Sequence, residues 1–256
     1  MAYSSNHRCF GFFGFFGFFG FFRFFGCFRF FGFLRGCMRL EVRTEGPHHG
    51  QPVVVTGAPL SAARAVGILL HGRGATALSI LDLGDAINRP DVAWLAPQPR
   101  GNTWYPNRFI APLASNEPWL SSALAAVGDV VAQVEEAGVP PTRIVLIGFS
   151  QGACLALEAL LRTPGLAGGA AGLSGGLIGP PGTVWPDAGR LDGVPVFLGC
   201  SDVDFHIPKE RVLESAEVLR ARGADVTAIL YPGMDHTVND EEIGYVRGVV
   251  DRVMKR

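Results

Sequence analysis

The sequence predicts an α/β fold with a mostly parallel central sheet flanked by helices on both faces. Short apolar segments alternate along the chain with longer amphipathic segments. The short segments are continuously apolar, as in strands that are covered on both sides. The chain has 256 residues, enough to bury a substantial core, and no internal repeat or second domain is visible after residue 37.

The expected strands are seven apolar segments, at residues 52–57, 65–70, 92–96, 143–148, 168–173, 194–199 and 226–231. Helices are expected between them at residues 77–87, 120–137, 151–162, 209–222 and 240–254. Pro140 and Pro141 separate the second helix from the next strand, because proline lacks a backbone N–H donor. Asn239 is the expected N-cap of the last helix, with Glu242 three residues later as in a capping box.

The first 37 residues differ in composition from the rest of the chain. They hold 15 of the 19 phenylalanines, four arginines and no acidic residue, in a Phe-Phe-Gly repeat. A period of three fits neither helix nor strand, and Arg23 and Arg29 argue against a membrane span. We therefore expect a leader, residues 1–37, that is disordered or a start-site artefact and is dispensable for the domain at 38–256. The alternative is lipoprotein-like anchoring through Cys37, because residues 34–37 resemble a cleavage box.

Charge and cysteine content exclude several classes of protein. Lys and Arg total 22 against 23 Asp and Glu, so the formal charge is −1 and no nucleic-acid partner is expected. Only Cys154 and Cys200 follow the leader, too few for a disulfide framework, and we expect a cytoplasmic protein. His48 and His49 lie in a Gly/Pro context typical of a solvated loop, and no metal or cofactor is expected.

Two serines lie in GxSxG patterns, which place a nucleophilic serine on a sharp turn between strand and helix. Ser150 lies in GFSQG, after the strand segment RIVLI and before the helical segment QGACLALEALLR. Ser174 lies in GLSGG but is followed by GGLIGPPG, which cannot start a helix. Ser150 is therefore the expected nucleophile, and Ser174 is expected to be a polar residue at a strand end.

A serine nucleophile needs a base and an acid, which in this arrangement follow later strands in the order Ser, acid, His. His236 follows the strand at 226–231, and it is the one histidine at a position suited to the base. Asp202 and Asp204 both follow the strand at 194–199, so the position alone leaves two candidates for the acid.

The strand at 65–70 ends in His-Gly-Arg-Gly, a turn that can supply a backbone N–H to an oxyanion hole. We expect the backbone N–H groups of Arg73 and Gln151 to form that hole. Trp104 and Tyr105 follow the strand at 92–96 and are candidates for the substrate pocket, with packing over the sheet edge as an equally weighted alternative.

A dinucleotide-binding alternative rests on residues 72–77, which fit GxGxxA between a strand and a helix, and on the segment VVVTGAP. It would make the chain an NAD(P)-dependent oxidoreductase. No acidic residue ends the next strand, however, and no Tyr is followed four residues later by Lys. The pattern therefore favours a hydrolase.

The segments LLHGRGAT, GFSQGA, SDVDFHIP and YPGMDHTVNDEEI together resemble the carboxylesterase, lysophospholipase and acyl-protein thioesterase family of α/β-hydrolases, over residues 65–256. The family pattern places the acid three residues before a Val/Ile-Pro pair, and this selects Asp204. The resemblance implies an α/β-hydrolase fold with no large lid domain and a triad of Ser150, His236 and Asp204.

The same resemblance implies hydrolysis of carboxylic esters or thioesters of modest size. We expect cleavage of small esters through an acyl-enzyme, with thioesters and lysophospholipids as further substrates, and a monomer or homodimer that spans no membrane. Residues 104–120 depart from it, since they are more aromatic than in the lysophospholipase members. A catalytically inactive binding protein of the same fold is the alternative from a different class.

Overall fold

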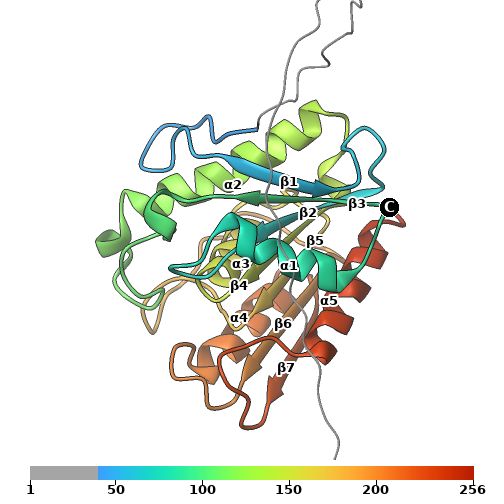
Figure 1. Ribbon diagram of the computed structural model, residues 1–256. Helices are drawn as coiled ribbons and strands as arrows, with labels where there is room; N and C mark the ends of the chain where they lie inside the picture. Colours follow the sequence, from blue (N-terminus) through green and yellow to red (C-terminus); the bar gives the residue numbers. More distant parts are fainter. Residues whose placement is uncertain (1–39) are drawn as a thin grey trace, which may run out of the picture. The chain divides into compact units, whose positions relative to one another are not determined.

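A seven-stranded sheet forms the centre of the computed structural model, which describes residues 40–256 (Figure 1). The strand order is β1-β3-β2-β4-β5-β6-β7; β1 pairs with β3 in antiparallel fashion, and all other neighbours are parallel. The strands are β1 (Val53–Gly57), β2 (Ala65–Leu70), β3 (Val92–Pro97), β4 (Ile144–Phe149), β5 (Gly169–Leu173), β6 (Pro195–Ser201) and β7 (Asp225–Tyr231). The expected leader, with its alternative of anchoring at Cys37, lies outside the described residues.

Helices cover both faces of the sheet and enclose two apolar layers. One layer packs under α2, α3 and α4, and the other under α1 and α5. The helices are α1 (Ala77–Ile87), α2 (Trp119–Glu136), α3 (Gln151–Arg162), α4 (Lys209–Ala221) and α5 (Asp240–Val253). The predicted fold class is confirmed, and each predicted element ends within two residues of the observed one. No helix among residues 40–256 is long and apolar enough to cross a membrane.

Burial explains why the apolar segments become strands. Every residue of β2 is buried, because helices lie on both faces of the sheet there. A fully buried aliphatic side chain such as Ile68 contributes about 1.5–3 kcal/mol to folding. The edge strand β7 is only partly covered, and its side chains are intermediate or exposed.

The start of α5 confirms the predicted capping box. Asn239 Oδ1 accepts a hydrogen bond from the Glu242 N–H at 2.9 Å, and Glu242 Oε2 accepts one from the Asn239 N–H at 2.9 Å. These two bonds satisfy N–H groups that a helix start leaves free. They also fix the start of α5, which follows His236 after a short loop.

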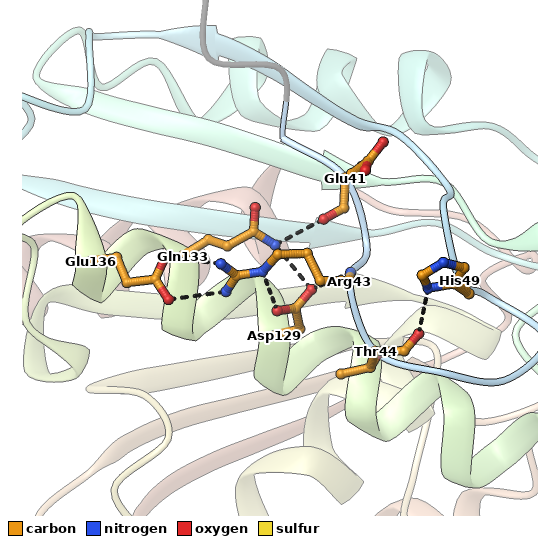
Figure 2. A network of polar contacts seen from close by, with 7 residues as sticks. All are labelled: Glu41, Arg43, Thr44, His49, Asp129, Gln133 and Glu136. Carbon is orange, nitrogen blue, oxygen red and sulfur yellow. Dashed lines mark hydrogen bonds and ion pairs between the residues drawn. The ribbon is translucent and has the colours of Figure 1, made fainter.

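The segment before β1, residues 40–50, is attached to α2 by a polar network (Figure 2). Asp129 on α2 accepts hydrogen bonds from the Arg43 backbone N–H at 2.6 Å, from Arg43 Nε at 2.9 Å and from Gln133 Nε2 at 3.0 Å. The Arg43 guanidinium also reaches Glu136, and Gln133 donates to the Glu41 carbonyl. Asp129 is the centre of this network, because it accepts three of these hydrogen bonds and its side chain is only 6% exposed.

The prediction that His48 lies in a solvated loop is wrong, whereas His49 is exposed as expected. His48 is fully buried, and its ring packs edgewise against Trp104 and Trp119. Its Nδ1 accepts the Arg100 backbone N–H at 3.2 Å, so Nε2 carries the proton and donates to the Trp104 carbonyl at 2.9 Å. Burial lowers the pKa of His48, and the ring is neutral.

Asp129→Ala should destabilise the domain by about 1–3 kcal/mol, because it leaves the Arg43 backbone N–H without an acceptor and the Gln133 amide with only the Glu41 carbonyl. Urea unfolding measures the change. Glu136→Ala is the matched control, since Glu136 is 63% exposed and should change stability little. Equal losses for the two variants would contradict the central role of Asp129.

His48→Gln should destabilise the domain most above about pH 6.5, the ordinary pKa of histidine in an unfolded chain. Because the pKa of His48 is lowered in the folded state, its stabilisation is fully present above that pH and is lost as the pH falls. The gap in unfolding free energy between wild type and His48→Gln should therefore shrink between pH 8 and pH 5, as measured by urea unfolding. His49→Gln serves as the exposed control, and a gap that stays constant with pH would argue against a neutral buried ring.

Candidate active site

Ser150 lies on a sharp turn between β4 and α3, as the GxSxG pattern predicts. Its backbone adopts φ 55° and ψ −119°, a strained conformation for a residue with a side chain. A Cβ on Gly148 would collide with the backbone of Gly152, and a Cβ on Gly152 would collide with the carbonyl oxygen of Leu70. Both glycines are therefore required by the close approach of β2, β4 and α3.

The structure brings Ser150 together with His236, which follows β7, and Asp204, which follows β6. Ser150 Oγ lies 2.9 Å from His236 Nε2, and His236 Nδ1 lies 2.6 Å from Asp204 Oδ2. The other carboxylate oxygen, Oδ1, accepts the backbone N–H groups of His206 at 2.8 Å and Ile207 at 3.1 Å. An unbroken chain of hydrogen bonds thus links the serine hydroxyl to a carboxylate.

The Asp204 side chain is fully buried, but its contacts still favour the ionised carboxylate. Burial by itself disfavours its charge. The hydrogen bond with His236 and the backbone N–H bonds outweigh that burial and hold the pKa of Asp204 below its ordinary value. An ionised carboxylate against Nδ1 fixes the orientation of the imidazole and keeps Nε2 directed at Ser150.

Asp202, the alternative acid, and Ser174, the serine of the second GxSxG pattern, lie away from this hydrogen-bonded chain. Asp202 Oδ1 accepts the Gly233 N–H at 2.8 Å and so connects the loop after β6 to the loop after β7. Ser174 is fully buried after β5, and its hydroxyl makes no hydrogen bond within the described residues. Neither side chain lines the cavity beside Ser150.

A cavity of about 600 Å³ opens beside Ser150 and His236. Tyr105 lines it, but Trp104, the other residue predicted for the pocket, does not. The Trp104 indole is buried behind the wall, where Nε1 donates to the His71 carbonyl at 2.9 Å. Of the two aromatic residues, the structure therefore brings only Tyr105 to the site.

The two residues predicted for the oxyanion hole, Arg73 and Gln151, both line the cavity. Within residues 40–256, neither backbone N–H donates a hydrogen bond to another residue. Gln151 is also the first residue of α3, where N–H groups are free and the helix dipole favours negative charge. Both amides are thus available to a bound oxyanion.

The side chain of Gln151 makes structural contacts that the sequence did not indicate. Its Oε1 accepts the Trp104 backbone N–H at 3.0 Å and the Thr103 hydroxyl at 3.2 Å, and its Nε2 donates to the Tyr105 carbonyl at 2.8 Å. These bonds attach the segment after β3 to the start of α3. The residue after the serine therefore also holds one wall of the cavity in place.

Cys154 and Cys200 are buried free thiols near the site. Cys154 lies one turn along α3 and faces the cavity, and Cys200 Sγ lies 3.9 Å from Asp204 Oδ2. Burial raises the pKa of each thiol to about 12. Both are therefore protonated at neutral pH and are not competing nucleophiles.

Gln151→Leu should destabilise the domain by about 1–3 kcal/mol, because the buried Trp104 N–H loses its acceptor and the Tyr105 carbonyl keeps only the Thr103 hydroxyl as a donor. Thr103→Val is the matched control, because it removes the hydroxyl contacts with Gln151 Oε1 at 3.2 Å and the Tyr105 carbonyl at 3.0 Å but keeps the carboxamide bonds to the Trp104 N–H and the Tyr105 carbonyl. Urea unfolding compares the two variants with wild type. A Gln151→Leu variant as stable as Thr103→Val would show that the carboxamide does not hold this segment.

Comparison with known proteins identifies the family. Residues 49–253 match the family model for phospholipase/carboxylesterase. The crystal structure of a phospholipase/carboxylesterase from Dyadobacter fermentans superimposes with a TM-score of 0.75 at 39% identity, covering 79% of this chain and 97% of that one.

Two relatives carry related names. An acyl-protein thioesterase 1 of Gibberella zeae is 39% identical over 46% of this chain, and the match spans about half (51%) of that protein. A probable carboxylesterase of Oryza sativa is 26% identical over 77% of this chain and 82% of that protein. From the family match and the fold, the chain belongs to the phospholipase/carboxylesterase family of α/β-hydrolases.

Proposed function

We propose that this protein is a serine hydrolase that cleaves carboxylic esters through an acyl-enzyme. Ser150 is the nucleophile, His236 the general base and acid, and Asp204 the group that orients His236. The observation that carries the proposal is the hydrogen-bonded chain from Ser150 Oγ through His236 to Asp204, at the edge of a cavity. A serine hydroxyl is a poor nucleophile without such a base, and this contact supplies one.

The reaction follows from these contacts. His236 Nε2 takes the hydroxyl proton as Ser150 Oγ forms a bond to the ester carbonyl carbon. The resulting oxyanion accepts hydrogen bonds from the Arg73 and Gln151 backbone N–H groups. His236 then gives the proton to the leaving alkoxide oxygen as the C–O bond breaks. Water, activated by the same imidazole, releases the acid and restores Ser150.

Thioesters are the second candidate substrate, because the thioesterase relative is 39% identical over the region it shares with this chain. The mechanism changes only in the leaving group, which is a thiol rather than an alcohol. Lysophospholipids are a further candidate through the family name. The substrate remains a small ester or thioester, in accordance with the cavity of about 600 Å³.

The alternatives from other classes have less support. An inactive binding protein has no need of an aligned serine, histidine and aspartate, and all three are present. For the NAD(P)-dependent oxidoreductase, the segment VVVTG should form a central parallel strand. It forms β1 instead, an antiparallel strand at the edge of the sheet.

Ser150→Ala should lower the rate of p-nitrophenyl acetate hydrolysis by a factor on the order of 10⁶, as loss of a triad nucleophile does elsewhere. Ser174→Ala is the matched control within the second GxSxG pattern. It should retain activity within a few-fold, because the Ser174 hydroxyl is buried and lies outside the cavity. An inactive Ser174→Ala with an active Ser150→Ala would refute the proposed mechanism.

Asp204→Asn should lower kcat by about 10⁴, because an amide that replaces the carboxylate stabilises the wrong imidazole tautomer. Asp202→Asn should have a much smaller effect, since the Asp202 carboxylate accepts only the Gly233 N–H among the described residues. Steady-state kinetics on the same ester separates the two. If Asp202→Asn were the more damaging change, the acid would be misassigned.

A further inference from the structure

The cavity beside Ser150 has positive charge at its rim and no acidic residue in its wall. Arg73 and Arg108 line it, and none of its other lining residues is an aspartate or glutamate. The nearby carboxylate of Asp204 is fully buried and engaged with His236. A cleft lined by one sign of charge attracts ligands of the opposite sign.

The guanidinium of Arg73 is held in place without being neutralised. Its Nη1 donates to the Pro106 carbonyl at 2.6 Å, and its Nη2 donates to the Asn107 carbonyl at 2.5 Å. Arginine has five N–H donors, so three remain for a ligand. Backbone carbonyls orient the cation but leave its full charge uncompensated.

Arg108 is attached in a similar way, since its Nη2 donates to the His206 carbonyl at 3.3 Å. Neither Arg73 nor Arg108 has a carboxylate within 4.0 Å among the described residues. Nine other arginines in that part of the chain do form such ion pairs. The two arginines at the cavity therefore differ from most arginines of the domain in being exposed, oriented and unpaired.

The floor of the cavity provides an independent observation. Tyr105 and Cys154 line it with fully buried side chains. They limit its depth, and the cavity volume is about 600 Å³. The floor therefore favours a short substrate.

Resting on the proposed function, we infer that the preferred substrate is a short ester that carries an oxyanion, a carboxylate or a phosphate, in addition to the bond that is cleaved. Arg73 and Arg108 bind this group at the cavity rim. The planar guanidinium fork matches both carboxylate and phosphate oxygens, and such charge-assisted hydrogen bonds are stronger than neutral ones.

The test compares esters matched in shape. Acetoxyacetate and isobutyl acetate differ in that a carboxylate replaces an isopropyl group on the alcohol side, and monomethyl glutarate and methyl 5-methylhexanoate differ in the same way on the acyl side. The ester 2-acetoxyethyl phosphate tests the phosphate. Each kcat/KM, measured by pH-stat, is divided by the hydroxide-catalysed rate constant of the same ester to remove intrinsic reactivity.

At least one anionic ester should exceed its neutral partner by about tenfold or more in this corrected kcat/KM, with the difference mainly in KM. Added salt should reduce the preference. Arg108→Gln should lower the ratio of anionic to neutral ester, and Arg108→Lys should restore part of it. Arg100→Gln, an exposed arginine away from the cavity, should leave the ratio unchanged.

Hydrolysis of isobutyl acetate with no preference for any anionic ester would overturn this inference and leave the proposed function intact. If Arg108→Gln did not change the ratio of kcat/KM between the anionic and neutral esters, the inference that Arg108 binds the anionic group would equally be overturned. If no ester of either kind were hydrolysed, the proposed function would fail, and the substrate inference would fail with it.

Discussion

Parallel pairing in the sheet is the constraint on which the candidate site depends. In a parallel sheet the carboxyl-terminal ends of the strands lie on the same side, so the loops after β2, β4, β6 and β7 meet there (Figure 1). The turn proposed for the oxyanion hole follows β2, Ser150 follows β4, Asp204 follows β6 and His236 follows β7. Residues separated by up to 86 positions in sequence, such as Ser150 and His236, come within 2.9 Å for this reason.

The strand ends alone do not fix the site, and the surrounding segments hold its residues in position. The strained backbone of Ser150 is held by the tight contact of β4 and α3 with β2. The Gln151 carboxamide connects α3 to the segment that carries Trp104 and Tyr105. His48, which bonds to the Trp104 carbonyl from the segment before β1, supports the same segment from behind. The cavity wall is therefore supported from the start of the domain as well as from the sheet.

Much of this arrangement was predictable from the sequence, because strand periodicity and turn residues are local signals. The sheet, the helices and the capping box at Asn239 followed from them, and so did the placement of His236 after a strand. The burial of His48 was not predictable, since it depends on Trp104 and Trp119, which are far away in sequence.

Local sequence signals also could not predict which residues line the cavity. Trp104 and Tyr105 are neighbours, and only the tertiary packing decides that Tyr105 lines the cavity. For Arg73 the sequence predicted a role only for the backbone N–H. The side chain was not predicted, because the carbonyls that orient its guanidinium belong to a separate loop at Pro106 and Asn107. The placement of Ser150, Asp204 and His236 at strand ends could be predicted from the sequence, whereas the contacts between loops that shape the cavity could not.

Covalent labelling with a fluorophosphonate tests the central claim most directly, because the reagent traps a serine only when a base activates it and an oxyanion hole binds the product. The labelled protein is digested and the adduct is located by tandem mass spectrometry. The account predicts one phosphonyl group per chain, on Ser150. A protein that hydrolyses esters without being labelled, or an adduct on Ser174 instead, would contradict it.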